Sequence, residues 1–280
     1  MASPGASPAA AVWVDGALVA PSQAVVSAFD HGLTVGDGVF ETLRIYGGAP
    51  FALRRHLDRL AASADGLGLR LPDRGVLAAA VVSVVEAAGL DDARLRITVT
   101  GGPAPLGSGR GDGGPTVVVA AGPLEPFGPT TAVVTLPWPR NERSPLSGCK
   151  TTSYAENVLA LARARDSGAG EAIFANTRGE LCEGTGSNVV VAREGRLMTP
   201  PLSSGCLAGV TRALVLEVAG VVESPLPLAA LAGASEAFLT STTREIQPIA
   251  AVDGVALAVA PGPLTTAAAM GWISRVVEVR

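Results

Sequence analysis

Hydrophobic and polar positions along the chain follow two periods, which predict an alternation of short strands and helices. The stretch from Arg94 to Thr100 alternates strictly, as is typical of a half-buried strand. Between Phe51 and Leu67, the apolar residues instead recur at helical spacing, so this range is expected to be a helix. Similar patterns predict further helices at Gly75–Ala88, Ser153–Ser167, Val210–Ala219 and Thr265–Val279.

Short apolar runs predict the remaining strands. Two such runs flank Asp15-Gly16, a two-residue turn signal, and predict a hairpin over Ala11–Val19. Other strands are expected at Gly38–Ile45, Thr116–Ala121, Thr131–Leu136, Glu171–Ala175, Asn188–Ala192, Ala237–Thr240 and Glu245–Val252. Residues 121–130 are rich in Pro and Gly. We therefore expect two mixed α/β domains, residues 1–121 and 131–280, joined by a linker at 122–130.

Composition narrows the class of protein. The chain has 280 residues, 48% hydrophobic and 16% charged, which is typical of a globular protein. Its net charge of −4 argues against a nucleic-acid-binding protein. The apolar run Val76–Ala88 is too short to cross a bilayer, and the Ala/Pro/Ser-rich start has no Lys or Arg of a secretory signal. We expect a cytoplasmic protein that does not enter membranes.

Histidine and cysteine usage does not favour a metal site. The three cysteines, Cys149, Cys182 and Cys206, form no C-x-x-C pair, and both histidines lie far from them in sequence. We expect reduced thiols and no bound metal.

Lysine usage is the sharpest compositional signal. Of the 21 basic residues, Lys150 alone is a lysine, so the other twenty are arginines. A general bias toward arginine explains most of this, but arginine cannot lose its proton and form a Schiff base as a lysine amine can. A chance survivor is the alternative. We favour a chemical requirement for Lys150, which follows a polar loop and precedes an expected helix.

A Schiff-base lysine is typical of enzymes that use pyridoxal 5′-phosphate (PLP), and these also need a phosphate cradle and an acid facing the pyridine nitrogen. Gly209–Arg212 offers amides at a helix start, Thr240–Thr243 offers hydroxyls, and Arg59 offers a cation. Glu183 stands beside a flexible turn and before an apolar strand. Taken singly, each of these is more often an ordinary cap, turn or surface residue.

Six segments in order resemble a known family. They are Val35–Arg44, Arg55–Leu60, Lys150 with its helix, Glu180–Val189, Leu207–Arg212 and Thr240–Pro248. Together they look like the class IV aminotransferases, which are PLP enzymes of fold type IV. The resemblance extends from about residue 12 to 275 and implies a two-domain fold of the D-amino-acid-aminotransferase kind, PLP as cofactor, and a homodimer.

The resemblance also implies roles for individual residues. Lys150 would form the Schiff base and shuttle protons, and Glu183 would pair with the pyridine nitrogen. Arg59, the amides of Val210 and Thr211, and the hydroxyl of Thr242 would bind the phosphate. The remaining cofactor contacts would come from Tyr154, Asn188 and Ser241.

Substrate choice is less well marked. Gly36-Asp37-Gly38 resembles the D-amino-acid and lyase branches, but Phe40 stands where the D-amino-acid enzymes have a carboxylate-binding tyrosine. The matching arginine is also missing from Thr100-Gly101-Gly102-Pro103. Another cation would have to hold the substrate carboxylate, and the loop candidates are Arg110, Arg140 and Arg143.

Two chemistries fit these motifs. An aminotransferase acting on D-amino acids or (R)-amines and a 2-keto acid is the first hypothesis. A 4-amino-4-deoxychorismate lyase, in which Thr42 would help move protons, is the second. A branched-chain L-amino-acid aminotransferase ranks lower. A PLP-binding protein without turnover ranks last, because lysine, acid, arginine and hydroxyls are all present.

Overall fold

The structure, a computed structural model, describes residues 10–279 and divides into two compact units. The first contains the described residues up to Glu125 together with Cys149–Ser153, and the second contains Pro126–Gly148 and Tyr154–Val279. The division after Glu125 falls within the range 122–130 that we expected to be a linker. Cys149–Ser153, which we expected within the C-terminal domain, packs with the first unit.

The first unit is built on a six-stranded antiparallel sheet. Its strands, in spatial order, are β2 (Ala17–Val19), β1 (Ala11–Val14), β6 (Val117–Pro123), β5 (Asp92–Thr100), β3 (Gly38–Tyr46) and β4 (Ala49–Pro50). The hairpin expected around Asp15-Gly16 is confirmed as β1 and β2. Pairing along the whole length of β3 and β5 places Phe40 opposite Thr98 and Thr42 opposite Arg96.

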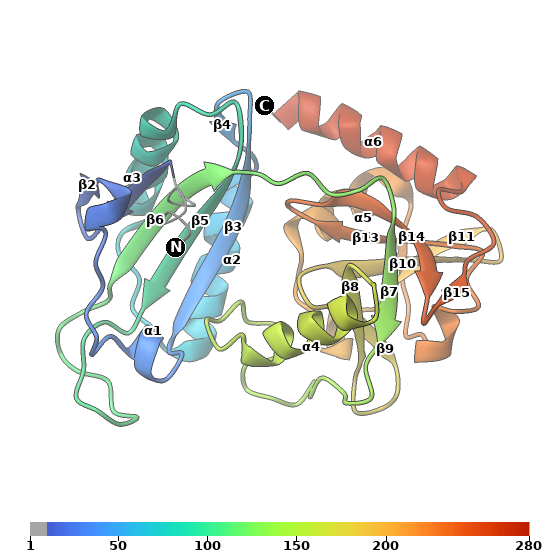
Figure 1. The fold of residues 1–280 in the computed structure, drawn as a ribbon, viewed down its shortest axis with the longest axis horizontal. Helices are drawn as coiled ribbons and strands as arrows, with labels where there is room; N and C mark the ends of the chain where they lie inside the picture. The colour runs from blue at the N-terminus through green and yellow to red at the C-terminus, as the bar shows by residue number, and fades with distance from the viewer. Residues whose placement is uncertain (1–9, 280) are drawn as a thin grey trace, which may run out of the picture. The chain divides into compact units, whose positions relative to one another are not determined.

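Two helices, α2 (Leu53–Leu67) and α3 (Arg74–Ala88), lie against one face of this sheet (Figure 1). Leu57, Leu60 and Ala64 of α2 pack in the core with Leu43 and other apolar residues of the sheet. Both helices end at a glycine in the left-handed conformation, where chains commonly leave a helix. The period-two pattern of β5 and the helical pattern of α2 are therefore both confirmed.

The second unit is built on a mixed nine-stranded sheet. Its path runs β12 (Val222–Glu223), β11 (Arg196–Thr199), β10 (Asn188–Arg193), β13 (Glu236–Ser241), β14 (Glu245–Val252), β7 (Thr131–Thr135), β8 (Glu171–Ala175) and β9 (Leu181–Gly184), with β15 (Val255–Ala256) beside β14. Strands β9 and β11 are short and are not predicted by the sequence pattern. They complete the sheet by pairing with β8 and β10.

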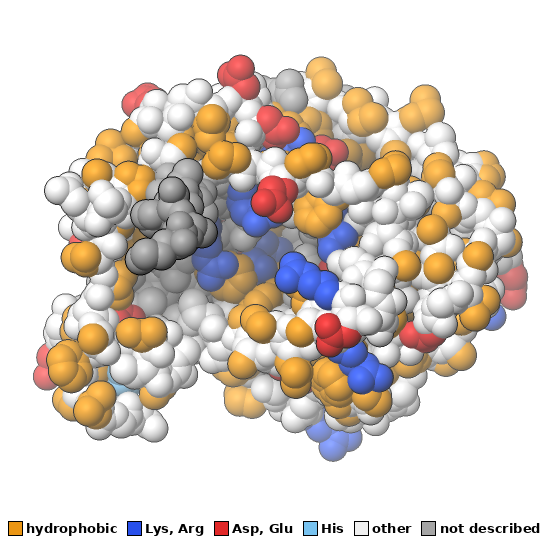
Figure 2. Space-filling view, in the orientation of Figure 1, with side chains coloured by type: hydrophobic (Ala, Val, Ile, Leu, Met, Phe, Trp, Pro, Cys, Tyr) orange, Lys and Arg blue, Asp and Glu red, His pale blue; other side chains and the backbone are white. Residues whose placement is uncertain are grey.

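Helices α4 (Ala155–Asp166), α5 (Val210–Ala219) and α6 (Pro263–Val279) pack on this sheet or on one another. In α6, Ala268, Trp272 and Val276 are buried at a spacing of four, whereas Met270 and Ile273 are exposed. Hydrophobic side chains are accordingly visible over α6 in Figure 2. The short helices are α1 (His31–Thr34), η1 (Pro21–Gln23), η2 (Leu202–Ser204) and η3 (Leu228–Ala230).

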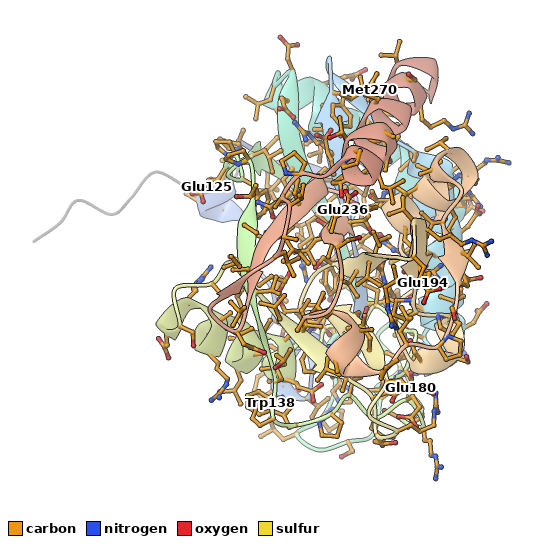
Figure 3. All side chains as sticks on the ribbon, turned by 90° about the vertical axis from the view of Figure 1, so that its right-hand side faces the viewer. Glu125, Trp138, Glu180, Glu194, Glu236 and Met270 are labelled. Atoms are coloured by element: carbon orange, nitrogen blue, oxygen red, sulfur yellow. The ribbon has the colours of Figure 1, made fainter. Side chains whose placement is uncertain are left out.

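The start of α6 is held by a side chain from the sheet. Glu236, at the beginning of β13, accepts hydrogen bonds from the backbone N–H groups of Leu264 (3.1 Å) and Thr265 (2.8 Å). Figure 3 shows Glu236 beside α6. A carboxylate at a helix start satisfies amides that have no partner within the helix, so Glu236 acts as the cap of α6.

Candidate active site

Lys150 is fixed by backbone pairing with β3 in the first unit. Phe40 N–H donates to the Lys150 carbonyl, and Lys150 N–H donates to Ser63 Oγ on α2, both over 3.0 Å. The next residue, Thr151, forms a β-bridge with Val39. The lysine that the composition singles out is therefore placed by a strand and a helix, although its own segment is a loop.

Two cations lie close to the ring of Phe40. Lys150 Nζ lies 4.3 Å from the ring centroid and the guanidinium carbon of Arg96 lies 3.7 Å from it. Arg96 Nε also donates to Thr98 Oγ1 over 3.0 Å. We did not single out Arg96 from the sequence. The signal that could have found it is the alternation of β5, which places Arg96 opposite Thr42 at the same face of the sheet as Phe40.

Arg59 forms an ion pair with the buried residue Glu41. Its Nε and Nη2 donate to the two carboxylate oxygens of Glu41 over 2.8 and 2.7 Å, and Glu41 is fully buried. His56 Nδ1 donates to the same carboxylate over 2.7 Å. Despite its burial, the hydrogen bonds and charges of Arg59 and His56 hold the pKa of Glu41 at about 2. Glu41 is thus an anion that orients Arg59.

His56 lies near both Arg59 and Lys150. Burial lowers the pKa of His56, Glu41 raises it, and the positive charges of Arg59 and Lys150 lower it further. The net direction is downward, so the imidazole is neutral at pH 7 and donates its Nδ1 proton to Glu41. Its Nε2 is buried and has no hydrogen-bond partner among residues 10–279.

The loop arginines that we considered for the substrate carboxylate have other partners. Arg110 binds both carboxylate oxygens of Asp37, over 2.7 and 2.6 Å, and also donates to two carbonyls at the end of α2. The same bonds hold the pKa of Asp37 below its usual value. The side chain of Arg143 is 83% exposed and lies 4.0 Å from Glu142. Arg110 is therefore engaged and Arg143 projects into solvent.

In the second unit, Glu183 lies on β9 with a partner on each carboxylate oxygen. Leu207 N–H donates to Oε2 over 2.9 Å, and Arg140 Nε lies 3.4 Å from Oε1. The loop after Leu207 is held by Asn188, whose side-chain amide donates to the Leu207 carbonyl over 2.9 Å. The structure thus brings Glu183 and Asn188 to the segment that leads into α5.

The first turn of α5 offers backbone N–H groups to an anion. Helix α5 begins at Val210, and its N-cap residue, Gly209, supplies no side chain to bond these amides. A Cβ atom on residue 209 would collide with Asn188 Oδ1, so the close approach of Asn188 requires glycine. Across the sheet from Asn188, Thr240 Oγ1 is buried and has no hydrogen-bond partner among the described residues.

The other expected cofactor contacts lie around these elements. Tyr154 is the N-cap residue of α4, and its hydroxyl donates to the Thr185 carbonyl over 3.1 Å. Ser241 ends β13, and its Oγ accepts a hydrogen bond from Arg244 N–H over 3.1 Å. Thr242 follows in the turn to β14 and is half-buried. Both hydroxyl-bearing positions are thus presented by a tight strand connection.

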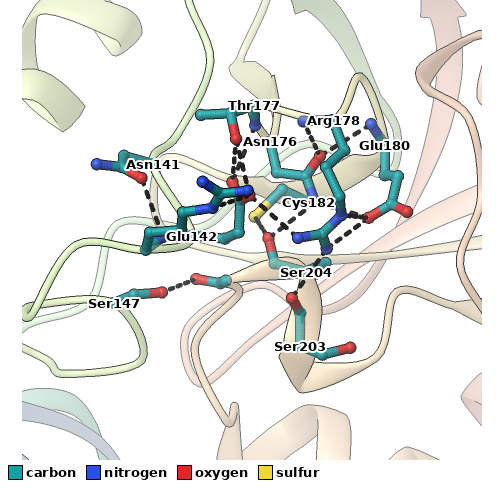
Figure 4. Close-up of polar contacts among 12 residues, drawn as sticks. Asn141, Glu142, Ser147, Asn176, Thr177, Arg178, Glu180, Cys182, Ser203 and Ser204 are labelled. Carbon is teal, nitrogen blue, oxygen red and sulfur yellow. Dashed lines mark hydrogen bonds and ion pairs between the residues drawn. The ribbon is translucent and has the colours of Figure 1, made fainter.

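A polar network fixes the loop that precedes Lys150 (Figure 4). Glu142 accepts hydrogen bonds from the backbone N–H and hydroxyl of Thr177, over 3.0 and 2.7 Å, and from Arg178 Nη1 over 3.0 Å. The bonds from Thr177 are the largest cause of the pKa of Glu142, which is about 2. Arg178 also pairs with Glu180 over 2.7 Å. Loop 141–148 is therefore anchored to the turn between β8 and β9.

The cysteines do not have the character of nucleophiles. Burial raises the pKa of Cys149 and of Cys182, and it raises that of Cys206 to about 11.

Among residues 10–279, no group of three or more His, Cys, Asp or Glu side chains is arranged to hold a metal ion. Within the same residues, no helix is both long and apolar enough to span a bilayer.

The residues present fit PLP. Its phosphate matches the amides at the start of α5 and the buried Thr240 hydroxyl. Its pyridine nitrogen matches the oriented carboxylate of Glu183, and its aldehyde matches the amine of Lys150. Arg59, held by Glu41, is a cation of the kind that binds phosphate groups.

Comparison with known proteins identifies the family. The family model described as amino-transferase class IV matches residues 38–252. The chain superposes on the branched-chain aminotransferase of Thermoproteus uzoniensis, solved with norvaline, with a TM-score of 0.89 and 34% identity over 96% of this chain and 95% of that one. Two curated relatives are a putative branched-chain aminotransferase of Methanocaldococcus jannaschii and a D-alanine aminotransferase of Bacillus licheniformis. The Methanocaldococcus protein is 36% identical, and the match covers 87% of this chain and 88% of that protein. The Bacillus enzyme is 33% identical, and the match covers 91% of this chain and 93% of that enzyme.

The expected fold class, a two-domain mixed α/β fold of type IV, is confirmed by these structures, and so is the expected cofactor. Branched-chain and D-alanine aminotransferases are comparably similar to the chain, so similarity does not single out the D-amino-acid and lyase branch that Gly36-Asp37-Gly38 favours. The chain belongs to the class IV aminotransferase family, and it is a PLP-dependent transaminase.

Proposed function

We propose that the enzyme moves an amino group from an α-amino acid to a 2-keto acid, and that Lys150 is its catalytic residue. Lys150 Nζ would hold the cofactor covalently and, once the substrate amine has displaced it, would carry the proton that the substrate α-carbon loses. PLP, when bound, supplies the electron sink that makes this proton acidic. The proposal is supported by the placement of the only lysine of the chain against β3 and Phe40.

The other cofactor contacts follow from the arrangement within each unit. We assign Glu183 to the pyridine nitrogen. The phosphate is bound by Arg59, by the amides of Val210 and Thr211, and by the Thr242 hydroxyl. Asn188 supports this cradle through its bond to the Leu207 carbonyl, while Tyr154 and Ser241 line the cofactor. Thr42, beside Phe40 on β3, lies on the Lys150 side and assists proton movement.

The observation that carries the choice of substrate is the cation pair on Phe40. Arg96 and Lys150 lie 3.7 and 4.3 Å from the centroid of one ring, within the first unit. An α-amino acid presents its amino group and its carboxylate a few ångströms apart, and a guanidinium is the strongest partner for a carboxylate. The substrate amino group would take the place of Lys150 Nζ on the cofactor, and Arg96 would bind the carboxylate, which favours amino acids over simple (R)-amines.

A D-amino acid is the donor that we propose first, because Gly36-Asp37-Gly38 resembles the D-amino-acid branch. A branched-chain L-amino acid is the second candidate, because branched-chain and D-alanine aminotransferases are comparably similar to the chain. A Cβ atom on residue 101 would contact the carboxylate of Asp37 and His31, so the packing leaves no room for an arginine there. The carboxylate clamp of the D-amino-acid branch is therefore replaced, in our proposal, by Arg96.

We also propose that the enzyme is a cytoplasmic homodimer. Val25, Phe29 and Leu33 of the first unit are 76%, 56% and 69% exposed, and large exposed apolar side chains close together in sequence support an interface. Each chain has a mass of 28.0 kDa. Light scattering should give twice this mass, and a particle of single-chain mass would contradict the dimer.

A half-reaction tests the proposed function. Purified holoenzyme is mixed with D-alanine, D-glutamate, L-leucine or (R)-1-phenylethylamine without keto acid, and the visible spectrum is followed. Conversion to the pyridoxamine form by an amino acid, but not by the amine, supports the proposal, and the responding enantiomer decides between the two donors. An unchanged spectrum with every amino acid would reject it and favour the lyase, which pyruvate release from 4-amino-4-deoxychorismate would then reveal.

A further inference from the structure

Arg140, in the second unit, has several contacts with its surroundings but no role in the proposed function. Its backbone N–H donates to the Ala175 carbonyl over 2.8 Å, so the start of loop 140–148 is fixed to the end of β8. Its guanidinium carbon lies 4.1 Å from the centroid of the buried Phe174 ring. Only 18% of the side chain is exposed. Arg140 is therefore held by the protein interior and does not project into solvent.

The guanidinium of Arg140 divides its nitrogens among three partners. Nη1 donates to Glu156 over 3.2 Å, and Nη2 donates to Asn157 Oδ1 over 3.4 Å, both on α4. Nε lies 3.4 Å from Glu183 Oε1 and is buried, and it forms no hydrogen bond with any described residue. The two terminal nitrogens thus fix the direction in which Nε faces Glu183.

Glu183 lies close to a cation and two thiols. Its side chain is 13% exposed, Leu207 N–H binds its second oxygen, and the titratable groups near it include Arg140 and the thiols of Cys182 and Cys206. Both thiols stay neutral because burial raises the pKa of each. Arg140 is thus a cation beside this carboxylate, and a neighbouring positive charge favours the ionised form of a carboxyl group.

We propose that Arg140 is a positioning residue that keeps Glu183 ionised and oriented, so that the proton shared with the cofactor stays on the pyridine nitrogen. The inference rests on the proposed pairing of Glu183 with that nitrogen. Arg140 contacts the carboxylate itself, so its charge acts more strongly on Glu183 than on the ring. Without it, the proton moves toward Glu183 Oε, and the ring withdraws electrons less effectively from the substrate.

A merely structural role is the competing explanation, since Arg140 also ties loop 140–148 to α4. The two roles differ in their dependence on Glu183. A structural arginine matters equally whether residue 183 is Glu or Gln. A residue that acts through the charge of Glu183 loses its effect once that charge is gone, which a double-mutant cycle measures.

The experiment compares Arg140→Met, Arg140→Lys and Glu183→Gln holoenzymes with the Arg140→Met/Glu183→Gln double variant. Arg165→Met, which removes an exposed arginine from α4, is the control for loss of one positive charge. The first readout is the pH dependence of the visible absorbance of bound PLP, which requires no substrate. The second is the rate of the half-reaction with the amino acid that the wild type accepts.

We expect Arg140→Met to shift the absorbance titration and to slow the half-reaction roughly 5- to 100-fold, the range found for coupled neighbouring groups. Arg140→Lys should restore much of both, and Arg165→Met should change neither. In the Glu183→Gln background, replacing Arg140 should have less than about a twofold further effect. Equal effects in both backgrounds, or a wild-type titration in Arg140→Met, would overturn the proposal.

Two further results keep the interpretation clear. If Arg140→Met fails to fold or to bind PLP, the comparison of Arg140→Lys with wild type decides, because lysine keeps the charge but cannot reach three partners at once. A shifted titration in Arg140→Lys equal to that of Glu183→Gln would overturn the role of the charge. A wild-type protein that binds no PLP would instead reject the proposed function itself, before Arg140 is tested.

Discussion

Glu41 and Arg59 form a two-point ion pair on a carboxylate that has no exposed surface. The two hydrogen bonds measure 2.8 and 2.7 Å, and His56 adds a third donor at 2.7 Å. A buried charge whose partner is removed is strongly destabilising, whereas the intact pair roughly offsets its own desolvation. The pair is therefore better understood as a device that fixes the guanidinium of Arg59 than as a source of stability.

Replacing Glu41 with Gln should destabilise the fold by about 3 kcal/mol or more, because Arg59 and His56 lose the anion between them. Urea denaturation of the apoprotein measures this free energy, and dialysis of the holoenzyme measures the expected faster loss of PLP. Asp92→Asn is the control. It breaks the more exposed pair with Arg44, whose N–O distance is 2.8 Å, and should cost less than about 1 kcal/mol. Equal stability of Glu41→Gln and wild type would contradict the role given to Glu41.

Stability should also fall as the pH decreases below 6.5. The pKa of His56 is lowered from its ordinary value of 6.5 in the folded protein, so the unfolded chain binds the proton first as the pH falls. Stability then rises with pH between the lowered folded pKa and 6.5, with a slope of up to about 1.4 kcal/mol per pH unit. Glu41, whose pKa is about 2, contributes only below its ordinary value of 4.5.

His56→Gln removes the titrating group and should flatten this slope. Denaturation midpoints of wild type and variant are compared between about pH 5 and 7.5, where carboxylates titrate little. The two proteins differ at residue 56 alone, so the contributions of all other groups cancel from the difference. Parallel pH profiles for the two proteins would show that His56 is not the origin of the slope.

The cap of α6 predicts an effect on the free energy of unfolding. Glu236→Ala should leave the N–H groups of Leu264 and Thr265 without their acceptor and cost roughly 1–2 kcal/mol, as lost helix caps do. Thermal or urea denaturation measures it. Glu194→Ala, in the turn between β10 and β11, is the matched control and should be neutral. A loss of the same size in both variants would mean that the cap contributes nothing specific.

The sequence pattern was sufficient where one element carries its own signal. The predicted bounds of Val210–Ala219 and Glu245–Val252 coincide with α5 and β14, because a helical face or a bounded apolar run is local information. Strand β9 was missed because its four residues form a strand only through pairing with β8. Its short run, with Glu183 inside it, has neither the length nor the alternation of an isolated strand.

The contacts within the site could not be predicted from the sequence where they join residues that are far apart in the chain. Lys150 could be found because arginine cannot replace it, and Glu183 because its segment resembles the family. The burial of Glu41 depends on donors 15 and 18 residues away on α2, and the contact of Arg140 with Glu183 joins a loop to a strand. In the sequence, Arg96 is one of several arginines in an alternating strand. Its contact with Phe40 becomes apparent only when β3 is paired with β5.

Lys150→Arg should keep the positive charge and the fold yet abolish turnover, because a guanidinium cannot form the covalent link to PLP. The visible absorbance of the linked cofactor should disappear, while near-wild-type denaturation midpoints show that the fold persists. Arg165→Lys exchanges the same two residue types on the exposed surface of α4 and should leave the absorbance intact. Retained turnover in Lys150→Arg would reject the central catalytic assignment.

Arg96→Met tests whether the cation on Phe40 binds the substrate carboxylate. Loss of a charged hydrogen bond of this kind should raise the KM for the amino acid roughly 10- to 100-fold, with a smaller change in kcat. Arg94→Met is the matched control, because Arg94 lies two residues earlier on β5 and pairs across the sheet with Arg44, away from Phe40. Uptake of PLP should be unchanged in both variants. An unchanged KM in Arg96→Met would show that another cation binds the substrate carboxylate. It would also remove the argument that the enzyme prefers amino acids over amines.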